Sequence, residues 1–251
     1  MKRIFFVVSL LLWTLAQTAL ADDIIVAGAA NVQFTLEDLK AEFTRETGIG
    51  VKTVIGSSGK LTSQIENGAP FDVFLSADMK YPATLYKEGF SLRSPKAYVY
   101  GVLVLWTMKD IDLSKGIKVL NDTGIGKIAL ANPDLAPYGR QAVNALKYYK
   151  LYGPLQKRIV LGESLSQANE FISTQAAGIG FTAESIVMAA NMKGKGKWVE
   201  VPPESYEPIA QGVIVLKYGQ ETHSKEAREF YDFLFSSPAK EIFRKYGYKL
   251  P

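Results

Sequence analysis

The chain has 251 residues, with 29 basic and 25 acidic side chains, one histidine and no cysteine. So small a charge excess gives no indication of a nucleic-acid or membrane-surface partner. Without disulfides the fold must be held together by its core, and a single histidine argues against a zinc site.

The first 21 residues have the pattern of a secretory signal peptide. Lys2 and Arg3 precede an apolar run over residues 4–15, and residues 19–21 form the small-residue motif Ala-Leu-Ala. We expect cleavage after Ala21 and release of a soluble periplasmic protein. No later apolar stretch approaches the roughly 18 residues that a membrane-spanning helix needs.

Next in chain order, short runs rich in Val and Ile alternate with amphipathic stretches, as in the β-α units of a mainly parallel sheet. This first set predicts strands over residues 24–27, 51–55 and 72–75, and helices over residues 32–47 and 59–67. In the first of these helices Leu36, Leu39 and Phe43 share one face, and Gly48 follows as a left-handed stop.

A second set predicts strands over residues 127–131, 158–161 and 180–182, and helices over residues 138–152 and 166–174. Long apolar strands are expected over residues 98–107 and 211–218, and helices over residues 224–235 and 238–246. Together these elements predict an α/β fold of two lobes joined by two crossover strands, the type II clamshell of periplasmic solute-binding proteins. We expect lobe I over residues 22–100, lobe II over residues 101–216 and a return to lobe I over residues 217–251.

Four strand-to-helix junctions are rich in small and hydroxyl residues. They are GAAN at 28–31, GSSGK at 56–60, NPDLAPYG at 132–139 and GESLS at 162–166. Ligands of open α/β sheets bind beyond the carboxyl ends of strands, where helix N-termini expose free N–H groups. Two junctions fall in each lobe and few cations accompany them, so we expect an oxyanion held by neutral donors.

Local sequence alone leaves the role of each junction residue open. Asn31 and Ser58 are ordinary helix N-cap residues, Tyr138 could be packed, and Leu165 offers only its backbone. We expect the bend before Asn31 to bring the N–H groups of Ala30 and Asn31 close to a ligand, with the Asn31 side chain capping the helix. Because four junctions share the pattern, ligand binding is favoured over capping alone.

Other functions remain as alternatives. A binder of sulfate or phosphate would use the same kind of cleft. Adjacent Tyr148 and Tyr149 resemble the tyrosine pair of exported ferric-ion binders, although their place in an amphipathic helix favours packing. An exported serine hydrolase would need Ser57 or Ser58 together with His223, which we expect in a surface loop.

Several stretches resemble the molybdate-binding proteins of bacterial ABC transporters. They are residues 29–31, 57–78, 132–142 and 162–168 and the ending 230–248, which includes a Phe-x-x-Tyr-Gly motif. The resemblance spans nearly the whole mature chain. It implies a receptor that closes on molybdate or tungstate and delivers it to a membrane permease. We further expect a monomer with no enzymatic activity, no cofactor and no nucleic-acid partner.

By position, the resemblance places the contacts at Ala30, Asn31, Ser58, Tyr138 and Leu165. These residues would contact the oxygens of the oxyanion and would not ligate the metal directly. Many family members have a contacting tyrosine where this chain has Ala183, and a small residue where it has Tyr138. We therefore expect the Tyr138 hydroxyl to replace the missing one.

Overall fold

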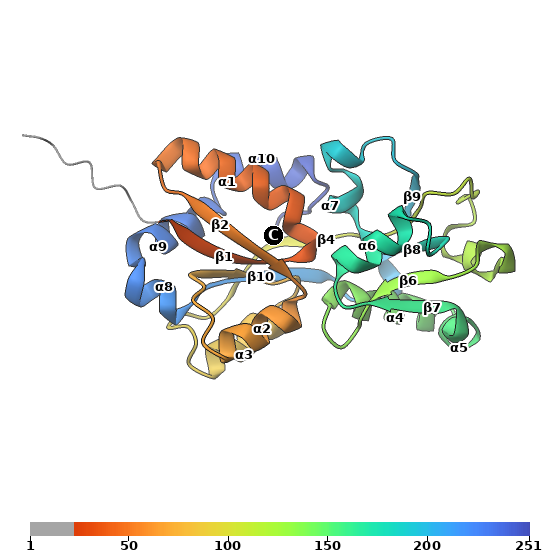
Figure 1. Cartoon of the computed structure of the whole chain (residues 1–251), viewed down its shortest axis with the longest axis horizontal. Coiled ribbons are helices and arrows are strands. Elements are labelled where there is room, and N and C mark those ends of the chain that lie inside the picture. The colour runs from red at the N-terminus through yellow and green to blue at the C-terminus, as the bar shows by residue number, and fades with distance from the viewer. Residues whose placement is uncertain (1–22) are drawn as a thin grey trace, which may run out of the picture.

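The computed structural model describes residues 23–251, which form two lobes side by side (Figure 1). The expected signal peptide lies outside the described residues. The first sheet has the order β2-β1-β3-β10-β4. Its strands are β1 (Ile24–Ala29), β2 (Val51–Gly56), β3 (Val73–Leu75), β4 (Lys96–Gly101) and β10 (Ile209–Val215).

The second sheet has the order β7-β6-β8-β5-β9. Its strands are β5 (Leu103–Thr107), β6 (Ile128–Ala131), β7 (Ile159–Gly162), β8 (Ile179–Ala183) and β9 (Lys197–Glu200). In each sheet one strand, β10 or β5, runs antiparallel to both of its neighbours. The predicted two-lobed α/β class is confirmed, although both sheets are mixed.

Helices flank both sheets. In the first lobe they are α1 (Gln33–Thr47), α2 (Ser58–Glu66), α3 (Lys80–Lys87), α8 (Lys217–Thr222), α9 (Ser224–Phe233) and α10 (Ser237–Lys245). In the second they are α4 (Pro137–Tyr148), α5 (Tyr152–Leu155), α6 (Leu165–Ser173) and α7 (Glu184–Val187). Short 3-10 turns cover Ala30–Val32, Gly116–Asn121, Thr123–Ile125, Gln156–Arg158, Ala190–Met192 and Pro203–Ser205.

The amphipathic pattern of the first helix is realised in the core of the first lobe. Leu36, Leu39 and Phe43 are fully buried, and Gly48 ends α1 with a φ of 76°. The Phe43 ring meets Phe230 of α9 edge to face, with ring centroids 5.1 Å apart. The C-terminal helices therefore pack on the first lobe, as predicted.

The crossings between the lobes differ from the prediction. The apolar run at 98–107 is broken at Val102, because β4 ends at Gly101 in one sheet and β5 starts at Leu103 in the other. Strand β10 pairs with β3 and β4, so residues 209–215 belong to the first lobe. Their assignment to a second lobe over 101–216 was wrong, because an apolar run does not specify which sheet completes its hydrogen bonds.

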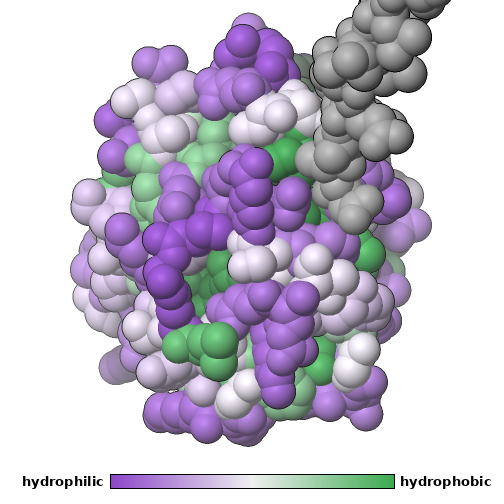
Figure 2. Space-filling view, turned by 90° about the vertical axis from the view of Figure 1, so that its left-hand side faces the viewer, coloured by the Kyte–Doolittle hydropathy of each residue, from purple (hydrophilic) through white to green (hydrophobic). Residues whose placement is uncertain are grey.

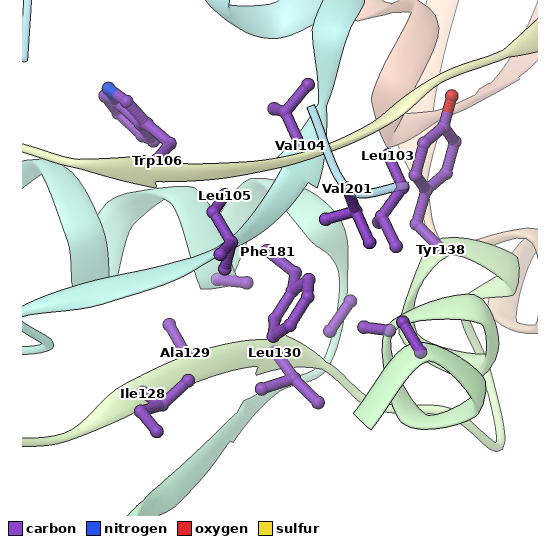
Figure 3. Packing of buried hydrophobic residues seen from close by; sticks show 14 of the residues in the cluster. Leu103, Val104, Leu105, Trp106, Ile128, Ala129, Leu130, Tyr138, Phe181 and Val201 are labelled. Carbon is purple, nitrogen blue, oxygen red and sulfur yellow. The ribbon is translucent and has the colours of Figure 1, made fainter. Parts of the chain in front are cut away.

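The core of the second lobe lies between its sheet and its helices. Figure 3 shows Leu105, Leu130 and Phe181 packed together. Tyr138, from the start of α4, lies at the edge of the same cluster with its hydroxyl directed away from the aliphatic side chains (Figure 3). The Tyr138 side chain therefore lies next to the region between the lobes.

The far end of the first lobe presents a mostly hydrophilic surface, with hydrophobic residues showing through in patches (Figure 2). Within residues 23–251, every helix is too short or too polar to cross a membrane.

Candidate functional site

A small cavity between the lobes is lined by residues from all four predicted junctions and by Ala77, which follows β3. The lining residues are Ala29, Ala30, Asn31, Ser57, Ser58, Ala77, Ala136, Pro137, Tyr138 and Leu165. All five predicted contact residues are in this set, so the fold brings them together. None of the lining residues, all of which lie in the described part of the chain, carries a charge.

Four helical segments begin at this cavity: the 3-10 turn at Ala30, α2 at Ser58, α4 at Pro137 and α6 at Leu165. The first N–H groups of a helix have no acceptor within it, and they carry the positive end of the helix dipole. Because Pro137 has no N–H, the first donor of α4 belongs to Tyr138. Two helix starts from each lobe thus surround one point with backbone donors, an arrangement suited to an anion.

The hydroxyl of Ser58 is not a helix cap. Ser57 caps α2 and accepts from the Lys60 N–H at 3.4 Å. Ser58 Oγ instead accepts from the backbone N–H of Ala77 at 3.0 Å. A hydroxyl that accepts one hydrogen bond keeps its own hydrogen to donate. Since Ser58 lines the cavity, that hydrogen is available to a ligand.

The expectation that Asn31 caps the following helix was wrong. Neither the 3-10 turn nor α1 has a side-chain cap. Asn31 Nδ2 donates to Gln211 Oε1 at 2.8 Å and to the Tyr248 hydroxyl at 3.0 Å. These long-range partners hold the side chain in the interior, which leaves the backbone N–H of Asn31 as its donor toward the cavity.

Gln211 on β10 was not predicted as part of the site. It is fully buried and connects Asn31 with the hydroxyls of Tyr98 and Tyr138. Its signal in the sequence is that it is the one polar side chain in the apolar run IAQGVIVL at 209–216. A polar group buried in such a strand must find hydrogen-bond partners.

Three buried tyrosines contact this pair of amides: Tyr98 and Tyr138 contact Gln211, and Tyr248 contacts Asn31. Burial raises the pKa of Tyr98 and of Tyr138 well above the usual range, with a further increase from neighbouring tyrosines. Burial also raises the pKa of Tyr248 to about 12. All three hydroxyls therefore keep their protons at neutral pH and add no negative charge beside the cavity.

The two lobes touch directly at the rim of the cavity. The Gly59 N–H donates to the Leu135 carbonyl at 2.9 Å, and the Tyr81 hydroxyl donates to the Asp134 carbonyl at 2.9 Å. A Cβ on Gly59 would lie 3.1 Å from the Leu135 backbone. Glycine at this position therefore permits the closest approach of the two lobes.

The two cations nearest the cavity are paired across the lobes. Lys60 Nζ lies 2.6 Å from Glu163 Oε1, and Arg140 forms an ion pair with Asp78. Both pairs join a residue of the first lobe to one of the second. Neither cation lines the cavity, in agreement with a site built from neutral donors.

The tyrosine pair lies away from this site. Tyr148 is exposed, while Tyr149 packs against the second-lobe core, and neither lines the cavity. Within residues 23–251, the His, Asp and Glu side chains form no group of three or more that could hold a metal ion. The geometry therefore favours packing, rather than iron chelation, for these two rings.

The expectation that His223 lies in an exposed surface loop was wrong. Its side chain is 15% exposed, and its Nδ1 lies 2.8 Å from Oδ1 of the fully buried Asp72. Asp72 precedes β3, whereas Ser58 follows β2, and both strands run parallel to β1. The histidine and the serine thus lie at opposite ends of one sheet, which excludes a serine hydrolase built from this pair.

The fold and the cavity define a two-lobed solute-binding protein. A family model described as bacterial extracellular solute-binding protein matches residues 24–249. The molybdate-binding protein ModA of Rhodobacter capsulatus is 39% identical over 93% of this chain and 91% of its own length. The ModA protein of Azotobacter vinelandii is 37% identical over 94% and 93%. The structure of the Azotobacter vinelandii periplasmic molybdate-binding protein superposes with a TM-score of 0.87 at 36% identity, covering 91% of this chain and all of that one.

The chain therefore belongs to the bacterial extracellular solute-binding protein family, within the group of ModA-type molybdate-binding proteins.

Proposed function

We propose that this protein captures molybdate or tungstate in the cavity between its lobes and delivers it to the membrane permease of an ABC transporter. The observation that carries the proposal is the convergence of four helical N-termini, two from each lobe, on a cavity without charged lining residues. The ModA relatives support the choice of ligand.

In this proposal the ion is held by the backbone N–H groups of Ala30, Asn31, Ser58, Tyr138 and Leu165, together with the hydroxyls of Ser58 and Tyr138. A hydrogen bond to a charged group contributes about 1.5–3 kcal/mol. Several such bonds, assisted by the helix dipoles, offset the loss of the ion's hydration. The same donors disfavour a protonated oxyanion, because its hydroxyl would face an N–H group that needs an acceptor.

Size provides the selectivity between oxyanions. Molybdate and tungstate are nearly equal in radius and charge, whereas sulfate is smaller and would leave some donors too far from its oxygens. Discrimination of this kind depends on the radius at which the donors are held. The contacts between the lobes at Gly59 and Tyr81 hold that radius in the closed state.

The proposed site of action is the periplasm, which the signal-peptide pattern of residues 1–21 supports. There the protein acts as a monomer that binds its ligand and passes it on without chemical change. A mobile carrier of this kind needs no cofactor.

A thermal-shift series on the mature protein tests the proposal, with molybdate, tungstate, sulfate, phosphate and ferric citrate as ligands. A ligand present at about a thousand times its dissociation constant stabilises the fold by about 4 kcal/mol. We expect molybdate and tungstate to raise the melting temperature and the other three to leave it unchanged. A larger response to sulfate, phosphate or ferric citrate would refute the proposed ligand.

A further inference from the structure

A buried amide lies behind the cavity and joins residues of both lobes. Gln211 Oε1 accepts from Asn31 Nδ2 at 2.8 Å and from the Tyr98 hydroxyl at 3.0 Å, while Gln211 Nε2 donates to the Tyr138 hydroxyl at 3.1 Å. Gln211 has no exposed surface and does not line the cavity. It therefore contacts the cavity residues without contacting what they bind.

The direction of these hydrogen bonds is fixed by the chemistry of an amide, which has one accepting and one donating end. Because the Tyr138 oxygen accepts from Gln211, its own proton remains free for another acceptor. The Asn31 side chain is held only through Nδ2, since its Oδ1 is buried and has no partner among the described residues. Gln211 and Tyr248 thus hold the Asn31 side chain, while the hydroxyls of Ser185 and Tyr248 donate to the Asn31 carbonyl at 2.8 and 3.1 Å.

The Tyr138 hydroxyl is seated at the crossing between the lobes. A Cβ on Gly101 would lie 2.0 Å from that hydroxyl oxygen and 2.6 Å from Gln211 Nε2. Gly101 ends β4 directly before the chain passes to the second lobe at Val102. The Tyr138 side chain of the second lobe therefore occupies space in the first lobe that is open only because residue 101 is glycine.

The strand that carries Gln211 is irregular at this point. The register of β10 against β4 shifts between Gln211 and Gly212. A local irregularity of this kind redirects a side chain relative to a regular strand. Gln211 thus points to the region where Asn31 of the first lobe and Tyr138 of the second come together.

We propose that Gln211 is a positioning residue for oxyanion binding, coupling the donors of the two lobes. By holding Asn31 and Tyr138 to one amide, it fixes the separation of their backbone N–H groups, so that both reach the same ion in the closed state. This inference rests on the proposed function, because it assumes that an oxyanion occupies the cavity.

Titration calorimetry with molybdate tests the coupling in the mature protein. Gln211→Met keeps the length of the side chain and removes its hydrogen bonds, and we expect an affinity at least about tenfold lower. Gly101→Ala leaves both partners intact but forces the Tyr138 hydroxyl away, so it should weaken binding similarly. Gln141→Met is the matched control, because buried Gln141 accepts from Asn144 and from the Glu207 N–H away from the cavity.

A pH series separates positioning from a general loss of stability. In Gln211→Glu the new buried carboxyl can donate only when it is protonated, so affinity should rise as the pH falls from 8 to 5.5, relative to the wild type. The loss of affinity in the double variant Gln211→Met with Tyr138→Phe should be smaller than the sum of the losses in the two single variants. Both substitutions remove the same hydrogen bond between these residues.

The inference is overturned if Gln211→Met and Gly101→Ala bind molybdate within about twofold of the wild type. So small a difference in affinity is well below the effect of losing one hydrogen bond. A flat pH profile for Gln211→Glu, with a melting temperature lowered as in Gln141→Met, would also reject it. Failure of the wild type to bind molybdate would instead reject the proposed function. The two failures are therefore distinguishable.

Discussion

Ser58 Oγ accepts a hydrogen bond from the backbone N–H of Ala77 at 3.0 Å. The contact joins the start of α2 to the segment after β3 inside the first lobe. It directs the serine hydroxyl hydrogen toward the cavity and satisfies a buried N–H group. Ser58 thus has a part both in the proposed binding and in stability.

Replacing Ser58 by alanine should therefore change two quantities. We expect the affinity for molybdate to fall by about tenfold or more, because a hydrogen bond to a charged ligand is lost. The free energy of unfolding of the unliganded protein should fall by about 1–3 kcal/mol, because the Ala77 N–H loses its partner. Calorimetry and chemical denaturation measure the two effects. Ser236→Ala is the control, since Ser236 also accepts from a backbone N–H, that of Ala239, but lies outside the cavity. Equal affinities for both variants would contradict the proposed role of Ser58.

The two ion pairs between the lobes should differ in their effect on binding. Both side chains of the Lys60–Glu163 pair are 51% exposed, whereas those of Arg140 and Asp78 are 28% and 18% exposed. Exposed pairs contribute about 0–1 kcal/mol, so Lys60→Met should reduce affinity by no more than about threefold. Arg140→Met should reduce it more and be less sensitive to added salt, because burial limits screening. Calorimetry at low and high salt checks this order, and a larger loss in Lys60→Met would contradict it.

The pair of His223 and Asp72 should affect stability but not binding. Asp72 is fully buried, and its second oxygen, Oδ2, accepts from the Ile25 N–H at 2.6 Å. His223→Ala removes the donor to Oδ1, so the free energy of unfolding should fall by about 1–3 kcal/mol. His223→Gln restores a donor and should recover part of this loss. Denaturation measures stability and calorimetry measures affinity. A weaker affinity for molybdate in His223→Ala would contradict the expectation that this pair affects stability only.

Glu184 should make stability depend on pH. Burial, and then the nearby charge of Glu200, raise the pKa of Glu184 to about 6 from an ordinary value of 4.5, against an opposing effect of Lys249. Because the folded-state pKa is raised, the contribution of Glu184 to the free energy of unfolding is fully present below pH 4.5 and is lost as the pH rises through 6. Glu184→Gln should therefore raise the melting temperature at pH 7.5 but not at pH 4.5. The exposed Glu66→Gln serves as the control for losing one negative charge. An equal gain at both pH values would contradict the assignment.

Much of the fold could be predicted from short-range patterns. The face formed by Leu36, Leu39 and Phe43 predicted α1, and Gly48 predicted its end. The small residues at the four junctions predicted which positions meet in the cavity. Such signals are readable because they depend on residues only a few positions apart.

The tertiary structure alone decided the parts that depend on distant partners. The sequence by itself determined the two-lobed class and the position of the helix starts, because periodicity and small-residue turns are local properties. It did not determine that Asn31 pairs with Gln211, 180 positions away, or that β10 completes the first sheet. Nor did it show that the hydroxyl of Ser58 is held by Ala77. A buried polar group takes whichever partner the folded chain brings within about 3 Å, and that partner is selected only when the distant segments of the chain have packed together.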